Sequence, residues 1–444
     1  MDESFARYLK LLERTERQSL PELAAYQEQL LEELVRHASA NVPFYRERLA
    51  CLSAGDGLDL SHWNEVPILE REEAIALGPA LRASHVPEGY GGVLETWTSG
   101  STGNALNLAY NGVIPVISNA ALTRMARWFG LDTSRPLATI RIHTQGEPPS
   151  YPEGATDSGW SRADPAAPSY GLDLRTPVSE QLEWLSRRRA PYLATLPANA
   201  MALAYAVTPE QGRKLGIEFI FTISETVIEG ARELIAERFG ARLAGIYSCQ
   251  EIGVIALECP AAPHYHVMAE NALVEIVDDN GRDVALGGFG RVILTGAYNY
   301  AMPFIRYAIG DVATAGKDAC PCGRTLPVIA QVEGRTRMAF VFRDGKRVWP
   351  RAWDVRGMKA FVPCLECQIV QIDYERIEFR YVPDGTGAAP DIDGLTALGR
   401  RIMHPSVEIV PVAMESLPRG PGGKFEQVIS MVSAQLPVLG TRRN

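Results

Sequence analysis

A run of hydroxyl and glycine residues, Thr98-Ser-Gly-Ser-Thr-Gly-Asn104, is the first segment of the chain whose composition points to chemistry. Glycines let the backbone approach a polyanion and expose amide N–H groups, while Ser and Thr hydroxyls donate to phosphate oxygens or ligate Mg²⁺. The segment lacks the GxxxxGK pattern of P-loop proteins. It is therefore interpreted either as a cradle for a triphosphate or as an exposed Ser/Gly turn.

Four further segments contain polar residues whose side chains could take part in chemistry. The Glu251 carboxylate is the kind of hard oxygen ligand that Mg²⁺ prefers, and the Asp311 carboxylate can accept two hydrogen bonds at once. The Lys424 ammonium can stabilise charge that develops in a transition state. Taken singly, each residue is as typical of a cap, a turn or a surface. The segments are Tyr247-Ser-Cys-Gln-Glu251, Ile305-Arg-Tyr-Ala-Ile-Gly-Asp311, Gly334-Arg-Thr-Arg337 and Pro418-Arg-Gly-Pro-Gly-Gly-Lys424.

In this order along the chain, the five segments resemble the motifs of the adenylate-forming superfamily, which includes acyl-CoA synthetases, peptide synthetase adenylation domains and luciferases. Within that superfamily the sequence is most similar to the phenylacetate-CoA ligase family. The resemblance extends from Val42-Pro-Phe-Tyr-Arg46 to Lys424 and so covers nearly the full length. Agreement of several ordered motifs makes coincidence a poor explanation.

The resemblance implies two catalytic residues and a phosphate-binding loop. Glu251 would hold the magnesium ion that bridges the ATP phosphates, and Lys424 would approach the α-phosphate and the attacking carboxylate. Asn104 stands where the family often has Lys or Arg, and Gln250 where it usually has Thr, so one positive charge near the phosphates is lost. The loop residues are Thr98, Ser99, Gly100, Ser101, Thr102 and Gly103.

The same resemblance implies a nucleoside site and a hinge. Tyr247 would pack beside the adenine, and Ser248 belongs to the same nucleotide site. Asp311 would accept hydrogen bonds from both ribose hydroxyls, and Arg335 would contact the ribose or a phosphate. Arg337 would be the hinge between two domains, although the family usually has Asp or Lys there.

The reaction implied by the resemblance has two halves. The carboxylate of an acid attacks the α-phosphorus of Mg·ATP, which releases pyrophosphate and leaves an acyl-adenylate. The small domain then rotates, removes Lys424 and admits a thiol, for which coenzyme A is the expected acceptor. The family favours an aryl or arylacetic acid, and the predicted pocket residues are Tyr192, Thr222, Ser224 and Glu225, which are equally consistent with core packing.

Two competing functions remain compatible with the residues. In the first, the same adenylation serves another acceptor or acid: an amine, a carrier-protein thiol, or an inorganic acid such as nitrite. In the second, the departures at Asn104, Gln250 and Arg337 mark a non-catalytic nucleotide-binding protein. The residues retained at the other motif positions speak against this second alternative.

A second group of residues has the composition of a metal site. Cys259, His266, Cys320 and Cys322 would supply four soft or borderline ligands, which suits a closed tetrahedral zinc site with a structural role. Similar positions occur in members of the resembled family. His264 lies on the same strand face and is the weaker choice for the histidine ligand. The alternative is buried thiols and surface histidines.

The elements that must position these residues can be predicted from periodicity. Ser19-Leu-Pro-Glu22 has the spacing of a capping box, and apolar residues then recur at helical intervals until about Asn41. From about 90 to 335, short apolar runs such as 137–140, 218–223 and 242–247 alternate with helical stretches, which predicts an α/β fold with buried mixed or parallel sheets.

The later part of the chain predicts two further units. An antiparallel strand pair around Asp278-Asp-Asn-Gly281 indicates a β-rich subdomain. After Arg335 the order strand, strand, helix, strand predicts a small, mobile α+β domain over 336–444 that bears the catalytic lysine. Residues 1–335 would then form the large AMP-binding domain.

Composition limits the partners. The formal net charge of −9 disfavours a nucleic-acid surface, and no stretch of about 18 apolar residues predicts a membrane span. Seven cysteines without a signal peptide make a disulfide framework unlikely to form. We therefore expect a cytoplasmic enzyme that binds a small acid, ATP with Mg²⁺ and a thiol, with a homodimer as one candidate assembly.

Overall fold

The computed structural model describes residues 3–55, 57–97, 106–143, 146–227, 230–317, 320–350, 357–418 and 425–432 of the chain. The chain divides into two compact units. The first comprises Met1–Val227, Ala231–Ile309 and Ala313–Val332, and the second comprises Ile228–Gly230, Gly310–Val312 and Glu333–Asn444. The predicted phosphate loop and Lys424 lie outside the described residues.

A mixed sheet of 12 strands forms the framework of the first unit, in the order β13-β14-β15-β16-β12-β11-β10-β9-β8-β5-β7-β6. Strands β7, β5, β8, β9 and β10 run parallel, and the strands beyond them on either side pair antiparallel where pairings are described. The strands are β5 (Leu137–Arg141), β6 (Ala155–Ser158), β7 (Pro168–Asp173), β8 (Tyr192–Thr195), β9 (Phe219–Ile223), β10 (Arg242–Cys249), β11 (Gly253–Glu258), β12 (Tyr265–Val267), β13 (Ala272–Val277), β14 (Phe289–Gly296), β15 (Tyr307–Ala315) and β16 (Val328–Arg335).

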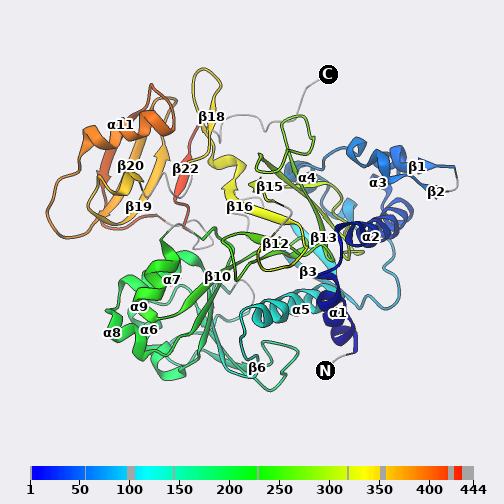
Figure 1. The fold of residues 1–444 in the computed structure, drawn as a ribbon, viewed down its shortest axis with the longest axis horizontal. Coiled ribbons are helices and arrows are strands. Elements are labelled where there is room, and N and C mark those ends of the chain that lie inside the picture. The colour runs from blue at the N-terminus through cyan, green and yellow to red at the C-terminus, as the bar shows by residue number, and fades with distance from the viewer. Residues whose placement is uncertain are drawn as a thin grey trace. The chain divides into compact units, whose positions relative to one another are not determined.

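Helices cover both faces of the parallel strands (Figure 1). In β9, Phe219 and Phe221 pack into the core beneath α5, while Ile220 points to the opposite core beneath α6 to α9. Burial on both faces explains why four of the five residues of β9 are apolar. The helices of this unit are α1 (Glu3–Thr15), α2 (Leu20–Asn41), α3 (Pro43–Arg48), α4 (Arg71–Leu77), α5 (Val113–Trp128), α6 (Val178–Arg188), α7 (Pro197–Tyr205), α8 (Pro209–Lys214) and α9 (Ala231–Phe239).

Short elements complete the first unit. The capping box predicted at Ser19 is present, because its side chain accepts from Glu22 N and the Glu22 carboxylate accepts from Ser19 N. The small pieces are the strand pairs β1 (Ser53–Ala54) with β2 (Gly57–Leu58) and β3 (Val93–Trp97) with β4 (Asn107–Asn111), and the 3-10 helices η1 (Ala50–Leu52), η2 (Leu60–Glu65) and η3 (Gly78–Leu81).

The second unit has its own core around a four-stranded sheet of order β21-β20-β19-β22. Leu395 of the amphipathic helix packs with Ile369, Phe379 and Ile409 of the strands. Its elements are η4 (Thr336–Met338), β17 (Phe340–Val341), β18 (Arg347–Val348), β19 (Cys364–Gln371), β20 (Arg376–Pro383), α11 (Ile392–Ile402), β21 (Glu408–Ala413) and β22 (Val428–Ser430). Within the described ranges, no helix has the length and apolarity needed to cross a bilayer.

Candidate functional site

Glu251 lies in the tight turn that joins β10 to β11. Cys249 pairs with Gly253 across this turn. Gly253 has a φ of +92°, and a Cβ there would lie 2.7 Å from Ser118 Oγ of α5, so the close approach of turn and helix requires glycine. The turn is folded inward, because the Glu251 side chain is only 4% exposed.

The Glu251 carboxylate is held by a cation and a phenol. Arg71 Nη1 donates to Glu251 Oε1 over 2.8 Å, and the Tyr307 hydroxyl donates to the same oxygen over 3.1 Å. Arg71 Nη1 also donates to the Tyr307 hydroxyl over 2.8 Å, which closes a triangle of three bonds. Burial, and then the Glu251 charge, raises the pKa of Tyr307 well above its usual value, so the phenol stays a donor.

A pairing between distant segments brings Arg71 to this carboxylate. Leu69 forms a parallel bridge with Tyr307, in which Leu69 N donates to Arg306 O and Ala308 N donates to Leu69 O, each over 2.9 Å. Arg71 begins α4 two residues later. Sequence reasoning missed Arg71, since it stands in the charged run Glu70-Arg-Glu-Glu73, which is typical of a solvated helix start.

Arg306 anchors the segment that leads to Arg71. Its Nη1 donates to the carbonyl oxygens of Asn64 and Val66 over 2.9 and 2.8 Å, and its Nη2 lies 3.0 Å from Glu275 Oε1. Both side chains are buried, with 2% of Arg306 and 6% of Glu275 exposed. A buried carboxylate needs this counter-charge, because desolvation otherwise outweighs the remaining hydrogen bonds.

The two predicted ribose-binding residues lie together in the second unit. Arg335 Nε is 2.9 Å from Asp311 Oδ1, and the Asp311 side chain is 9% exposed against 41% for Arg335. Gly310 precedes Asp311 with a φ of +84°, and its carbonyl oxygen accepts from Thr336 Oγ1 over 3.3 Å. The positive φ favours glycine at position 310.

The other predicted nucleotide and pocket residues are less grouped. Tyr247 is half-buried and lies at an irregularity in the register between β10 and β11, next to Ser248. Arg337 lies in η4, and its side chain is not described. Thr222 is buried and donates to Ala244 O over 3.2 Å.

Two of the predicted pocket residues, Tyr192 and Glu225, have contacts that the structure describes. Tyr192 is a core residue, since it is 1% exposed, packs edge-on against Trp160 and accepts a hydrogen bond from Asp132 N over 3.0 Å. Glu225 Oε2 accepts from Ala198 N over 3.1 Å in the first turn of α7. Ser224, which precedes Glu225, has a φ of +70°, an unusual conformation for a residue with a side chain.

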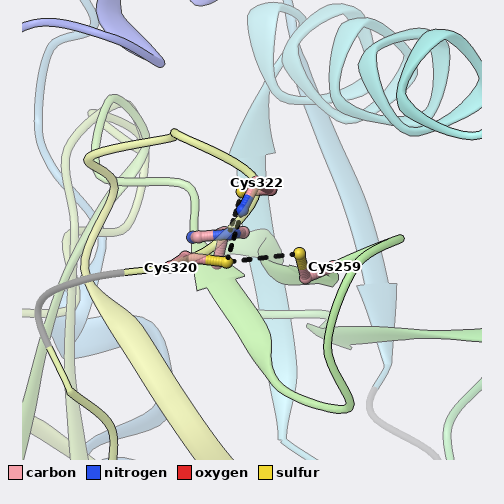
Figure 2. Close-up of side chains that lie close together, drawn as sticks. Cys259, Cys320 and Cys322 are labelled. Carbon is pink, nitrogen blue, oxygen red and sulfur yellow. Dashed lines mark hydrogen bonds between the residues drawn. The ribbon is translucent and has the colours of Figure 1, made fainter.

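The four predicted zinc ligands converge. Figure 2 shows the side chains of Cys259, Cys320 and Cys322 pointing toward one another. With His266 they place one ligand atom each within 4.8 Å of all the others. Cys259 Sγ lies 3.5 Å from Cys320 Sγ, and Cys322 Sγ lies 3.3 Å from His266 Nε2.

These separations are close to the edges of a zinc tetrahedron. Bonds of about 2.3 Å to sulfur and about 2.0 Å to nitrogen imply about 3.8 Å between two sulfurs and about 3.6 Å between sulfur and nitrogen. His266 Nδ1 lies 3.3 Å from Leu326 O, which fixes the tautomer that leaves Nε2 for a metal. Burial lowers the pKa of His266 to about 4, so the ring is neutral at neutral pH.

His264 is a rival for the same position. Its Nε2 lies 3.1 Å from Cys320 Sγ, and its ring packs edge-on against His266 at 5.1 Å. Burial lowers the pKa of His264 as well. His266 is the better-supported ligand, because only its nitrogen belongs to the group of four mutually close ligand atoms.

The loop that carries Cys320 and Cys322 also contacts the N-terminal segment. Thr325 N donates to Glu16 O over 3.1 Å, and Thr325 Oγ1 donates to Gln18 O. The Arg324 guanidinium lies 4.2 Å from the centroid of the Trp128 ring, whose Nε1 donates to Glu16 Oε2 over 2.7 Å. The Cys/His cluster thus lies beside a set of contacts that join this loop to α5 and to the α1–α2 connection.

Comparison with known proteins gives relatives over most of the chain. No protein-family model matches it. A phenylacetate-coenzyme A ligase of Thermus thermophilus is 26% identical over 365 residues, which are 77% of this chain and 76% of that protein.

Two solved structures are similar in fold. A 2-hydroxyisobutyryl-CoA ligase in its postadenylation state, in complex with R3-HIB-AMP, matches with a TM-score of 0.73 at 18% identity, over 95% of this chain and 92% of that one. ATP-bound MatB from Rhodopseudomonas palustris matches with a TM-score of 0.55 at 15% identity, over 74% of this chain and 65% of that one. The predicted fold class and the predicted resemblance to phenylacetate-CoA ligases are confirmed.

Arg306→Gln should destabilise the first unit by about 3–5 kcal/mol, because it leaves the Glu275 carboxylate buried without a counter-charge. Arg306→Gln/Glu275→Gln should recover part of that loss. The measurement is the urea midpoint of unfolding. Arg291→Gln is the matched control, since Arg291 pairs with Glu70 of the same segment but is more exposed. A loss below about 1 kcal/mol for Arg306→Gln would contradict the anchoring role.

Proposed function

We propose that this chain, which has the fold of the adenylate-forming CoA ligases, is an ATP-dependent acid–CoA ligase. It would adenylate a small aryl or arylacetic acid, release pyrophosphate and transfer the acyl group to coenzyme A. The observation that carries the proposal is the match of 95% of the chain to a CoA ligase holding an acyl-adenylate. The acid class is supported by the similarity to a phenylacetate-CoA ligase.

Glu251 is proposed as the ligand of the magnesium ion that arrives with ATP. Its carboxylate is buried, paired with Arg71 and held at Oε1 by two donors, so its direction is fixed before the nucleotide binds. A preorganised oxygen ligand costs little rearrangement when the ion arrives. The ion would neutralise phosphate charge and so open the α-phosphorus to the acid.

Asp311 and Arg335 are proposed to hold the ribose. The Asp311 carboxylate can accept from two hydroxyls, and the more exposed Arg335 can follow the ribose or a phosphate while remaining near Asp311. The carboxylate of the acid then forms the new P–O bond as the bond to pyrophosphate breaks. Lys424 would stabilise the charge that develops on the α-phosphate.

In the second half-reaction the coenzyme A thiolate attacks the acyl carbon, and AMP leaves. Thioester formation requires Lys424 to withdraw, for which we propose a hinge at Arg337 in η4. Adenine and ribose contacts by Tyr247, Ser248 and the 98–103 loop are part of the same proposal. Because ATP and coenzyme A are cytoplasmic substrates, we place the enzyme in the cytoplasm.

Zinc is proposed as a structural ion at Cys259, His266, Cys320 and Cys322. The donor set is the thiolate and imidazole set that zinc prefers, and four protein ligands leave no position for a reacting water. Burial raises the pKa of the Cys320 thiol to about 12, so a bound metal ion would have to supply the counter-charge that makes this sulfur a thiolate.

Pyrophosphate exchange into ATP should depend on an added acid. In a panel of benzoic, arylacetic and short aliphatic acids and nitrite, we expect an aryl or arylacetic acid to give the fastest exchange, and added coenzyme A to yield its thioester. Labelled pyrophosphate is followed in the exchange and the thioester by mass spectrometry. Exchange without thioester formation would indicate another acceptor, and no exchange with any acid would indicate a non-catalytic protein.

Lys424→Ala should slow adenylate formation by about 10²- to 10³-fold, the usual loss when one stabiliser of transition-state charge is removed. Thioester formation from a supplied acyl-adenylate should stay near the unmodified rate. Lys317→Ala, at an exposed lysine, is the control and should change neither half-reaction. Equal loss of both halves in Lys424→Ala would disprove this division of labour.

Metal analysis of the purified protein should find one zinc ion per chain. Cys320→Ser and His266→Ala should lose it and lower the melting temperature, whereas His264→Ala should keep it, because His266 belongs to the converging group. Zinc is measured by elemental mass spectrometry. Retention of zinc in His266→Ala together with its loss in His264→Ala would reverse the assignment.

A further inference from the structure

The polyphosphate end of ATP needs a positive charge that the motif residues do not supply. The predicted phosphate loop, residues 98–104, contains no Lys or Arg. Lys424 is proposed for the α-phosphate and Arg335 for the ribose side, so neither accounts for the β- and γ-phosphates, which carry most of the negative charge of ATP. A cation from elsewhere in the chain has to meet them.

Arg71 stands where such a cation is required. Its Nη1 lies 2.8 Å from Oε1 of Glu251, the proposed magnesium ligand. Magnesium binds oxygens at about 2.0–2.1 Å in an octahedron, so a phosphate oxygen on the same ion would lie about 3–4 Å from the carboxylate oxygen. The phosphates bound to that ion therefore arrive beside the guanidinium.

We infer that Arg71 is a substrate-binding residue that exchanges partners: it pairs with Glu251 in the nucleotide-free enzyme and with the β- and γ-phosphates when Mg·ATP is bound. The inference rests on the proposed function. Magnesium takes over as the counter-charge of the carboxylate, so the guanidinium no longer has to neutralise it. A planar guanidinium matches two phosphate oxygens at once, which an ammonium does not.

The burial of the three residues fits this exchange. Arg71 is 21% exposed, whereas Glu251 is 4% exposed and Tyr307 is fully buried. Arg71 is therefore the member of the triangle that a ligand can reach, and Tyr307 stays behind as a donor to Oε1. The carboxylate keeps one fixed hydrogen bond while its ionic partner changes from guanidinium to magnesium.

The partner exchange assigns Arg71 to one half of the reaction only. In adenylation, the bond between the α-phosphorus and pyrophosphate breaks and the electron pair stays with pyrophosphate, so a cation on its oxygens stabilises the leaving group. In thioester formation pyrophosphate has already left. Arg71 should then have no ligand to stabilise.

Binding measurements with Arg71→Gln and Arg71→Lys test the inference directly. The affinities are measured by calorimetry in the presence of Mg²⁺. Arg71→Gln should weaken the affinity for ATP and for pyrophosphate by about tenfold or more. Its affinity for AMP should change by less than about twofold, because AMP lacks the β- and γ-phosphates. Arg71→Lys should recover part of the loss. Adenylation should slow in Arg71→Gln, while thioester formation from a supplied acyl-adenylate should keep its rate.

Arg48→Gln is the matched control, since Arg48 forms an ion pair with Glu73 of the same helix, α4, without a described contact to Glu251. Arg48→Gln should leave the affinities for ATP, pyrophosphate and AMP unchanged. Equal weakening of AMP in Arg71→Gln would indicate a merely structural role, and unchanged or tighter binding of ATP and pyrophosphate would show that Arg71 only neutralises Glu251. Either result overturns the inference. The binding tests need no turnover, so they remain decisive even if no acid supports exchange.

Discussion

A carboxylate buried in a tight turn requires a counter-charge, and much of the first unit follows from that requirement. The Glu251 side chain is only 4% exposed, and Arg71 and Tyr307 both donate a hydrogen bond to its Oε1. Arg71 reaches it only because Leu69 pairs with Tyr307, and that pairing is supported by the buried Arg306 and Glu275 pair. Close contact between Gly253 and Ser118 fixes the turn itself. One ionic interaction thus depends on five segments that are far apart in the chain, around residues 70, 118, 252, 275 and 307.

The two proposed metal ions would bind different kinds of ligand. Magnesium would enter with ATP and meet a carboxylate oxygen, a hard ligand that suits a transient ion. Zinc would meet three thiolates and one imidazole in a closed shell that suits a permanent one. Their neighbours differ accordingly: Glu251 lies beside the half-buried Arg71, which a ligand would reach, whereas His266 is fixed by Leu326 O and the Trp128 ring. In the proposed enzyme, oxygen would therefore hold the ion that takes part in the reaction, and sulfur and nitrogen would hold the ion that stabilises the fold.

Local features of the fold were predictable because their causes are local. The capping box at Ser19 and the apolar period after it define α2, and the largely apolar run of β9 indicates a strand buried on both faces. The convergence of Cys259, His266, Cys320 and Cys322 could also be predicted, because few other roles suit that set of residues. Arg71 could not, since its partner lies 180 residues away and the pairing of Leu69 leaves no sequence signal. Tyr192 was a plausible pocket residue by type, but its register at the start of β8 turns it into the core.

The set of contacts around the cysteine loop has a consequence for how the chain is made. Glu16 and Gln18 are synthesised early, but their partner Thr325 and the ion pair of Arg124 with Glu270 come from much later in the chain. On the ribosome, the apolar face of α1, with Phe5, Leu9 and Leu12, has no partner until Val116 and Ala120 of α5 have been made. Contacts of such large sequence separation form slowly and leave apolar surface open to aggregation. The end of α1 is therefore translated among the first elements, but the hydrogen bonds of Thr15 and Glu16 there form only after Glu270 and Thr325 have been made.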